Sequence, residues 1–327
     1  MNSRRRVVQT WLAGACAALA FSGPAAFAAE SAPLRILVGF PAGGATDVVA
    51  RILAERLRDE LGGRPVLVEN RAGAGGQIAT QTLKSAAPDG NTVMLTIDHS
   101  QVVIPLTIAS AEYDPVADFT ALGGVAQYYN ALGVRGDIGV TDMASLKAWL
   151  QKNPGQTNIG VPAAGSVPQF AVHLVGESFG VPLNSVPYKG GAPLVQDIVG
   201  GHVSGGVASM TDLIEQHKTG RVKILATSGE RRNATLPDVP TFAEAGVAGI
   251  EMNPWLAFFG PKGMSPEFVQ NFNAALNRVL AQPEVKARLA ALGNQVSPTT
   301  PDELQAWVVN ATRHWGDVIQ RAGFKPQ

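Results

Sequence analysis

Short apolar runs alternate with amphipathic stretches along this chain, and the alternation predicts strands followed by helices. The first run, Leu34 to Phe40, is rich in aliphatic residues and is bounded by Pro41, which is typical of a buried strand. Beyond a short loop, apolar residues recur at the spacing of one helix face as far as Leu61. A strand, a loop and a helix follow one another, so an α/β fold is predicted.

The same pattern continues through the rest of the chain. Ser265 and Pro266 open a predicted helix, and Thr300-Pro301-Asp302-Glu303 has the composition of a capping box with proline at the first helical position. Thr141 is the expected cap of a helix in the middle of the chain. Further strands are predicted at 66–68, 91–97, 119–125, 131–134, 157–161, 185–188, 205–208 and 222–226.

The loop after the first strand has the composition of an anion site. Gly43 and Gly44 allow a ligand to approach the backbone closely, and the start of a helix presents N–H groups that lack helical partners. Thr46 and Asp47 are both good N-cap residues for that helix. An ordinary tight turn between a strand and a helix has the same composition, so the loop alone does not distinguish the two.

Three more glycine-bearing loops join predicted strands to predicted helices, at Asn70 to Gln77, Ala163 to Val167 and Lys189 to Ala192. In open α/β sheets such loops collect at the carboxyl ends of the strands, where ligands bind. Two of the four loops fall in each half of the chain. An anion held between the halves would make contacts that exist only when they close, so we expect closure on binding.

Residues 1–28 have the pattern of an export signal and are not expected to belong to the fold. The arginines Arg4 to Arg6 precede a largely apolar stretch, Val7 to Phe21, and Ala26-Phe27-Ala28 fits a cleavage site. A membrane anchor is the alternative, but the stretch is short and rich in alanine. The arginines also resemble a twin-arginine export signal, although the ordinary secretory route fits better.

Composition narrows the class of protein. Without residues 1–28 the chain has 299 residues with 23 basic and 26 acidic side chains, a net charge of −3, so nucleic acid is not an expected partner. The only cysteine, Cys16, lies in the removed segment, and no disulfide is expected. No apolar run of the mature chain approaches the ~20 residues of a membrane span, so a soluble protein is expected. Its length favours two domains.

Few patterns suit catalysis, metal binding or a cofactor. The five histidines do not occur at ligand spacing, and H-E-x-x-H is absent. Gly73-Ala74-Gly75-Gly76 lacks the third glycine of a dinucleotide fingerprint, and Gly165-Ser166 is not part of a G-x-S-x-G motif. We therefore expect a binding protein without catalytic residues, metal or cofactor. The alternative is a small-molecule hydrolase or isomerase that uses Ser166 or His99.

Five segments of the sequence match a known family. They read FPAGGATDVVARILAERL, VENRAGAGGQIA, AAPDGNTVML, VPYKGGAPLVQDIVGG and LPDVPTFAEAG. In this order they closely resemble the periplasmic solute-binding proteins of tripartite tricarboxylate transporters, known as the Bug or TctC family. The resemblance runs from about Leu34 to the C-terminus.

The resemblance implies the two-lobed type II fold of periplasmic binding proteins, the Venus flytrap, with two α/β domains joined by a two-segment hinge. We expect residues 29–127 and 252–327 to form one domain and residues 128–251 the other. The implied function is a periplasmic receptor that binds a small organic carboxylate and delivers it to the membrane subunits of the transporter. A sensor kinase is an alternative partner, and a monomer is expected.

In this family, backbone groups and waters of the first two loops hold a ligand carboxylate. Asp47 also suits a capping role, and for Arg71 we favour an ion pair with Glu69 or Asp47 over ligand contact. Trp255 suits the pocket wall and the core equally. The resemblance places ligand contacts at Pro41, Ala42, Gly43, Gly44, Ala45, Thr46, Asp47, Asn70, Arg71, Gly75 and Gly76; candidates beyond these loops are His99, Ser100, Ser166, Tyr188, Lys189, Gly190 and Trp255.

One departure from the family bears on the ligand. Val207-Ala208-Ser209-Met210 stands where many relatives carry an acidic residue that faces the cleft. Without that acid, the amino group of a ligand would lack a partner. The sequence therefore slightly disfavours an amino acid as the ligand.

Overall fold

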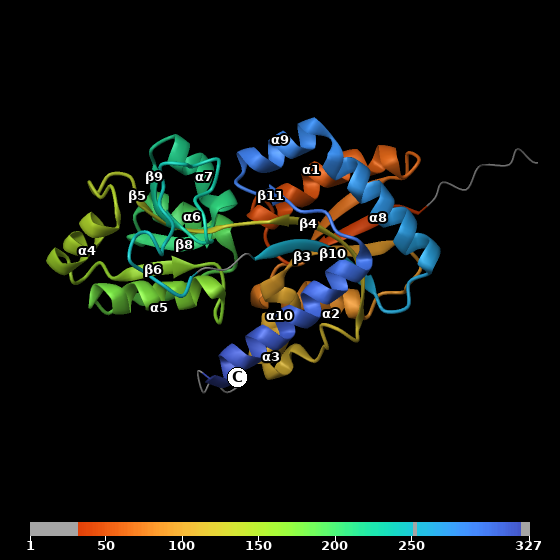
Figure 1. The fold of residues 1–327 in the computed structure, drawn as a ribbon, viewed down its shortest axis with the longest axis horizontal. Helices are drawn as coiled ribbons and strands as arrows, with labels where there is room; N and C mark the ends of the chain where they lie inside the picture. Colours follow the sequence, from red (N-terminus) through yellow and green to blue (C-terminus); the bar gives the residue numbers. More distant parts are fainter. Residues whose placement is uncertain (1–31, 251–253, 322–327) are drawn as a thin grey trace, which may run out of the picture. The chain divides into compact units, whose positions relative to one another are not determined.

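The computed structural model describes residues 32–250 and 254–321, and the expected export signal lies outside this range. The described residues form a six-stranded sheet, with strand order β11-β4-β10-β3-β1-β2, and a five-stranded sheet, with strand order β7-β6-β8-β5-β9 (Figure 1). We call each sheet, with the helices packed on it, a lobe; the first lobe is that of the six-stranded sheet.

The first lobe takes its elements from both ends of the described chain. Its strands are β1 (Leu34–Val38), β2 (Val66–Asn70), β3 (Thr92–Ile97), β4 (Phe119–Gln127), β10 (Trp255–Pro261) and β11 (Gln295–Val296). Its helices are α1 (Ala45–Glu60), α2 (Gln77–Lys84), α3 (Ile104–Thr107), α8 (Pro266–Ala281), α9 (Pro283–Ala291) and α10 (Pro301–Arg321). Short 3₁₀ turns span Ala74–Gly76 and Ala109–Ala111, and a π-helical turn spans His99–Val103.

The second lobe is built from the middle of the chain. Its strands are β5 (Asn130–Arg135), β6 (Asn158–Val161), β7 (Asn184–Pro187), β8 (Gly205–Ser209) and β9 (Val222–Thr227). Its helices are α4 (Met143–Lys152), α5 (Val167–Phe179), α6 (Gly191–Gly200) and α7 (Met210–Lys218). The chain enters this lobe between β4 and β5 and leaves it between β9 and β10, so two segments connect the lobes.

Parallel pairing brings the strand-to-helix loops to common edges. Strand β1 pairs in parallel with β2 and β3, and β6 pairs in parallel with β7 and β8. The loops that follow parallel strands leave the same edge of a sheet, as expected for a ligand-binding α/β fold. Strand β10 runs antiparallel between β3 and β4, and β5 runs antiparallel between β8 and β9.

Alternating side chains of the central strand β10 explain why helices cover both faces of the first sheet. Leu256 and Phe258 pack into a core with α1, α8 and α9. Trp255, Ala257 and Phe259 pack into a second core with α2 and α10 on the opposite face. Trp255, the candidate wall residue, is therefore a buried core residue that contacts Phe259.

Several local expectations are confirmed and others need correction. Ser265 accepts a hydrogen bond from the Phe268 N–H, and Thr300 and Glu303 form the expected capping box. The cap of α1 is Gly44, however, not Thr46 or Asp47, and the cap of α4 is Asp142. Helix α9 and strands β10 and β11 were not expected.

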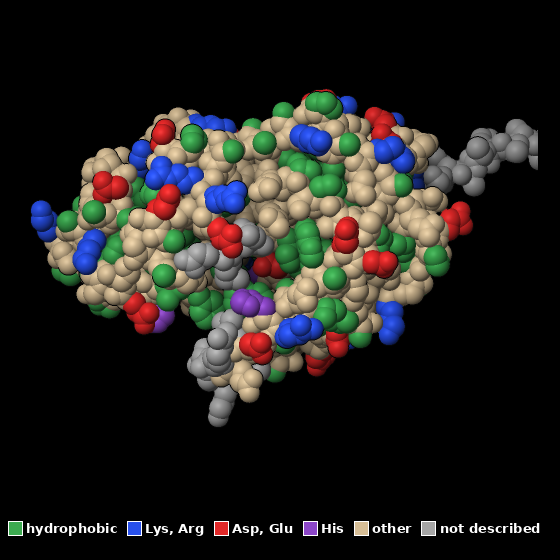
Figure 2. Space-filling view, viewed as in Figure 1, with side chains coloured by type: hydrophobic (Ala, Val, Ile, Leu, Met, Phe, Trp, Pro, Cys, Tyr) green, Lys and Arg blue, Asp and Glu red, His purple; other side chains and the backbone are tan. Residues whose placement is uncertain are grey.

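Surface features agree with a globular chain that carries both signs of charge. On the face shown in Figure 2, basic and acidic side chains are interspersed, and neither gathers into a large patch. Within residues 32–250 and 254–321, no helix has the length and apolar character needed to cross a bilayer.

Candidate functional site

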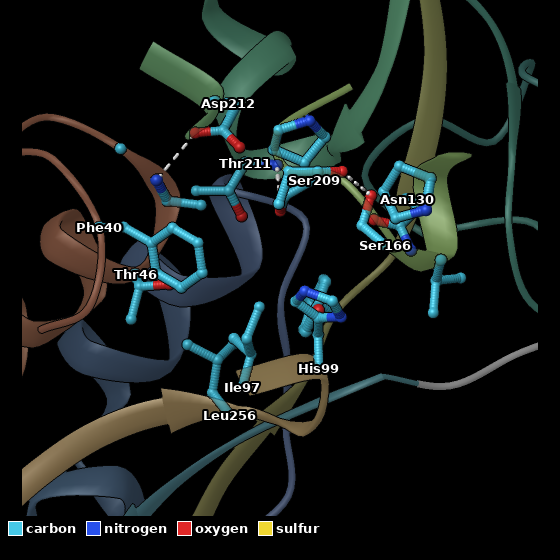
Figure 3. A pocket seen from close by; sticks show the side chains of 18 of the residues that line it. Phe40, Thr46, Ile97, His99, Asn130, Ser166, Ser209, Thr211, Asp212 and Leu256 are labelled. Carbon is cyan, nitrogen blue, oxygen red and sulfur yellow. Dashed lines mark hydrogen bonds between the residues drawn. The ribbon is translucent and has the colours of Figure 1, made fainter. Parts of the chain in front are cut away.

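A pocket of about 60 Å³ is lined by residues of both lobes (Figure 3). Its walls are mostly apolar, with a few polar side chains between them. The first lobe contributes Phe40, Gly44, Ala45, Thr46, Val49, Ile97, His99, Tyr128, Leu256 and Asn294; the second contributes Asn130, Pro162, Ala163, Ser166, Val167, Pro168, Gly191, Ser209, Thr211 and Asp212.

The start of α1 forms one wall of this pocket. The first N–H groups of a helix have no partners within the helix, and Gly44 at the N-cap has no side chain to supply one. The Ala45 N–H donates instead to Asp212 Oδ1 of the second lobe, at 2.8 Å. The expected anion site at this loop therefore already contacts a carboxylate of the protein itself.

Asp47 holds the loop in place and does not line the pocket. Its carboxylate is 1% exposed and accepts hydrogen bonds from the Gly43 N–H (2.8 Å), Arg51 Nε (2.9 Å) and Asn70 Nδ2 (2.9 Å). Burial raises the pKa of Asp47, but these hydrogen bonds outweigh it and hold the pKa below its usual value. Asn70 also donates to the Phe40 carbonyl, at 3.0 Å, which ties the second loop to the first.

A second pocket, of about 420 Å³, is lined by the loop at Asn70 to Gln77 and by parts of the loops at Ala163 to Val167 and Lys189 to Ala192. Phe40, Pro162 and Ala163 line both pockets, so the two are neighbours. Tyr188 on its wall donates to Asp197 at 2.7 Å, an interaction that with burial raises the pKa of Tyr188 to about 12. Of the four loops expected at one site, the first lines the first pocket, the second lines the second pocket, and the third and fourth line both.

The predicted site residues fall into three groups. Those on the first pocket are Gly44, Ala45, Thr46, His99 and Ser166. Those on the second pocket are Gly75, Tyr188, Lys189 and Gly190. Neither pocket is lined by Pro41, Ala42, Gly43, Asp47, Asn70, Arg71, Gly76, Ser100 or Trp255.

Several members of the third group have structural partners. Arg71 Nε donates to Glu69 at 2.6 Å, which is one of the ion pairs considered from the sequence. Ser100 Oγ donates to the Gly75 carbonyl at 2.6 Å, and an added Cβ at Gly76 would overlap the Ser100 side chain. These contacts shape the second loop from behind the pockets.

His99 is a buried side chain that faces the first pocket without a protein partner. It is 5% exposed, and neither ring nitrogen has a hydrogen-bond partner. Burial lowers the pKa of His99 to about 4, so the ring is neutral at pH 7. A neutral imidazole can donate from one nitrogen and accept at the other, and Figure 3 shows His99 directed toward the open space.

Tyr128 and Asp98 lie beside His99. The Tyr128 hydroxyl donates to Asp98 Oδ1 at 3.3 Å. Burial raises the pKa of Asp98 to about 7, although hydrogen bonds from the backbone N–H of His99 and from the Tyr128 hydroxyl partly oppose the shift. Burial also raises the pKa of Tyr128 well above its usual value.

Asp212 is the lining residue that most changes the interpretation of the sequence. Segment 207–210 lacks the acid seen in many relatives, but α7 begins at its last residue, Met210, and the first turn of α7 places the Asp212 carboxylate on the pocket. Burial raises the pKa of Asp212 to about 6, with the Ala45 N–H opposing the shift. The expectation that the cleft lacks an acid is therefore wrong. The sequence did contain a signal for this position: the pattern Ser209-x-x-Asp212 is typical of a helix start and places Asp212 in the first turn of that helix.

The charge of the first pocket is unusual for a carboxylate site. Its lining residues include one acid and neither Lys nor Arg. Within the part of the chain that the structure describes, no cluster of three or more His, Cys, Asp or Glu side chains could hold a metal ion. Recognition of a ligand carboxylate in this pocket would rest on neutral hydrogen-bond donors.

Two α/β lobes, joined by two segments and lining one pocket together, define a solute-binding protein of the periplasmic type. A family model described as "Tripartite tricarboxylate transporter family receptor" matches residues 49–324, and the chain belongs to this family. Protein BugT of Bordetella pertussis is 32% identical over 294 residues, which is 90% of each chain. The family and the fold class predicted from the sequence are both confirmed.

Solved structures of similar proteins have the same fold. Periplasmic binding protein BugD has a TM-score of 0.85 at 32% identity, and R. palustris Rpa4515 with adipate has a TM-score of 0.84 at 29% identity. Each similarity covers 91% of this chain and 99% of the other chain. The two-lobed fold is thus shared along the whole described region.

Proposed function

We propose that this chain is a periplasmic receptor that binds a small organic carboxylate between its lobes and delivers it to the membrane subunits of a tripartite tricarboxylate transporter. The observation that carries the proposal is that the first pocket, at the N-terminus of α1, has walls from both lobes. A helix N-terminus favours an anion, and here the Ala45 N–H already holds the Asp212 carboxylate, so a ligand carboxylate would bind on the side of the pocket where His99 lies. The similar protein Rpa4515 has adipate, a dicarboxylate, in its structure.

The proposed mechanism is closure of two domains on the ligand. We infer that residues 29–127 and 252–327 move as one domain and residues 128–251 as the other, since the chain passes between the sheets at two segments. Ala45 and Asp212 come from different lobes and are hydrogen-bonded to each other. The pocket between them exists only when the lobes are together, so ligand contacts would favour the closed state.

The neutral donors of the pocket suit a carboxylate of small size. His99 has two unpartnered ring nitrogens, and its N–H would donate to a ligand oxygen. The Ser166 hydroxyl already donates to the Ala163 carbonyl at 2.7 Å. Toward a ligand, its oxygen would accept a hydrogen bond, or the hydroxyl would donate to the ligand in place of the Ala163 carbonyl.

The alternative function, a hydrolase or isomerase that uses Ser166 or His99, has less support. A serine nucleophile requires a base within hydrogen-bond reach of its hydroxyl. Here Ser166 donates to a backbone carbonyl, and His99 makes no hydrogen bond to it. The family and the similar solved structures are receptors and binding proteins. We therefore propose binding without conversion of the ligand.

A thermal-shift screen of mono-, di- and tricarboxylates against the purified mature chain tests the proposal. An acid at 100 times its Kd stabilises the folded state by about 2.7 kcal/mol. The matched control for each acid is its neutral amide, which keeps the carbon skeleton and should give no shift. The absence of a shift with any acid, or chemical conversion of a stabilising acid detected by NMR, would overturn the proposal.

Export and partners need separate tests. We propose that the secretory route exports the chain and that cleavage follows Ala28, so N-terminal sequencing of periplasmic protein should start at Ala29. Retention of the intact chain in the cytoplasm would contradict this. Light scattering should give the mass of a monomer. Genes for transporter membrane subunits beside this one would support delivery to a transporter, whereas a sensor-kinase gene would favour signalling.

A further inference from the structure

The Asp212 carboxylate lies on the wall of the first pocket with no basic side chain on that wall. The titratable side chains that also line the pocket are His99 and Tyr128. Asp98 contacts Tyr128 and adds a second acid behind the wall. Asp47, whose carboxylate lies near the same helix start, has the nearby cation Arg51 as its own partner. Asp212 therefore faces the cavity without charge compensation from the lining residues.

The position of this carboxylate is fixed from both lobes. Oδ1 accepts the Ala45 N–H of the first lobe at 2.8 Å. On the other side the carboxylate packs against Gly191 at the start of α6, where an added Cβ would overlap it. Figure 3 shows Asp212 at one end of the pocket, with a dashed line for the hydrogen bond that its carboxylate accepts. These contacts hold the carboxylate in one position on the pocket wall, unlike a mobile side chain on the surface.

We propose that Asp212 determines ligand specificity by accepting a hydrogen bond from a hydroxyl or ammonium group on a small monocarboxylic acid. The inference rests on the proposed function, because it assumes that the pocket binds a carboxylate. It names the class of acid that the pocket selects. A second ligand carboxylate at the Asp212 end is disfavoured.

Hydrogen-bonding capacity favours a ligand donor at this end. An ionised carboxylate accepts about four hydrogen bonds, and the Ala45 N–H supplies one at Oδ1. A ligand hydroxyl or ammonium group would supply another, and an ammonium group would also neutralise the charge. A ligand carboxylate would place two negative charges together in a partly buried site, where like charges repel strongly.

His99 provides the complementary end of the pocket. Its ring is buried, unpartnered and on a different side of the pocket from Asp212 (Figure 3). Its ring N–H is available to donate to the carboxylate of the ligand. A ligand that spans the two residues would have one carboxylate and one donor group. This reverses the expectation, drawn from segment 207–210, that an amino acid is disfavoured.

The test uses one four-carbon skeleton and measures Kd by calorimetry. The probes are butyrate, succinate, and butyrate with a hydroxyl or an ammonium group at C2, C3 or C4. With the wild type, at least one hydroxyl or ammonium derivative should bind about 10- to 100-fold more tightly than succinate, the range of a hydrogen bond to a charged group. The hydroxyl and ammonium series separate the two kinds of donor.

Two variants test the residue. Asp212→Asn keeps the shape and an oxygen for the Ala45 N–H but removes the charge, and it should reduce the preference over succinate at least 10-fold. Gly191→Ala keeps the charge and displaces the carboxylate, so it should reduce the preference in the same direction. Asp238→Asn, at an exposed position away from both pockets, is the matched control and should retain the wild-type preference.

The outcomes separate this inference from the proposed function. Succinate binding to the wild type at least as tightly as every derivative, with no change in Asp212→Asn, would overturn the inference and leave a carboxylate receptor. An unchanged preference in folded Gly191→Ala and Asp212→Asn would also overturn it. If no carboxylate binds the wild type or either variant, both proposals fail. Cooperative melting of each variant shows that it is folded.

Discussion

The loop around Asp47 and the pocket wall around Asp212 use the same chemical group in opposite ways. Both carboxylates lie near the start of α1. Asp47 is fully buried, accepts three hydrogen bonds and has a lowered pKa. Asp212 accepts one hydrogen bond, at Oδ1, and burial raises its pKa to about 6.

The difference shows how a structural carboxylate can be told from one that faces a ligand. A carboxylate whose acceptor sites are filled by the protein stabilises the local fold and has nothing left to offer a ligand. A carboxylate with unused acceptor sites in a partly desolvated place is less stable when ionised. Such a residue costs folding stability and is more readily explained by recognition.

The largest expected effect is on folding stability at Asp47. Asp47→Ala removes the shared acceptor of Gly43, Arg51 and Asn70, and should lower the free energy of unfolding by about 2–4 kcal/mol. Urea denaturation measures this loss. Asp238→Asn, which changes an exposed acid, should stay within about 0.5 kcal/mol of the wild type. A wild-type denaturation curve for Asp47→Ala would show that the loop does not depend on this residue.

Gly44 lies at the boundary between the two regions, and its substitution should affect binding more than folding. A valine side chain at Gly44 would extend toward the pocket and toward Asp212 Oδ1, which an added Cβ would approach to 3.9 Å. We expect Gly44→Val to weaken binding of the screened carboxylate about 100-fold, or about 2.7 kcal/mol, with a cooperative melt preserved. Normal binding by this variant would place the site elsewhere.

The pH dependence of stability should have opposite signs for the two acids. The raised pKa of Asp212 means that its contribution is fully present below the unfolded value near 3.8 and is lost as pH rises through about 6. The stability of Asp212→Asn relative to the wild type should therefore increase by about 1–2 kcal/mol between pH 4 and pH 7.

Asp47→Asn gives the opposite sign and serves as the comparison. Because the pKa of Asp47 is lowered, its contribution is present above the unfolded value and is lost as pH falls through the folded value. The difference in free energy of unfolding between the wild type and Asp47→Asn should shrink when the pH falls below 4. Urea curves at four pH values for both variants measure this. If the free energy of unfolding relative to the wild type changed with pH in the same direction for both variants, the contrast between Asp47 and Asp212 would be contradicted.

The smallest effect is expected at Ser166, whose hydroxyl donates within its own lobe. Ser166→Ala leaves the Ala163 carbonyl without that donor and removes an acceptor from the pocket wall. Binding should weaken by about 0.5–1.5 kcal/mol, mainly through faster dissociation. Stopped-flow kinetics with the best acid from the screen measures both rates. A loss of more than 100-fold would mean that Ser166 is a principal ligand contact.

Features that depend on local sequence were predictable. The caps at Ser265 and Thr300 were identified correctly, because a cap is a hydrogen bond between residues three positions apart. The cap of α1 was not, because Asp47 lies in the first turn and reaches back to the Gly43 N–H. At α4 two adjacent candidates, Thr141 and Asp142, differ by one residue, and Asp142 accepts the Ser145 N–H.

The sequence by itself determined the α/β class, because hydrophobic periodicity specifies which face of each strand and helix is buried. Five sequence segments identified the family by resemblance, and the resemblance implied the two-lobed fold. Only the tertiary structure decided which loops share a pocket. Asp212 and Ala45 lie 167 positions apart and meet through the packing of two lobes, each formed by its own core. No local pattern encodes how many hydrogen bonds a carboxylate receives after that packing. The roles of Asp47 and Asp212 follow from that number.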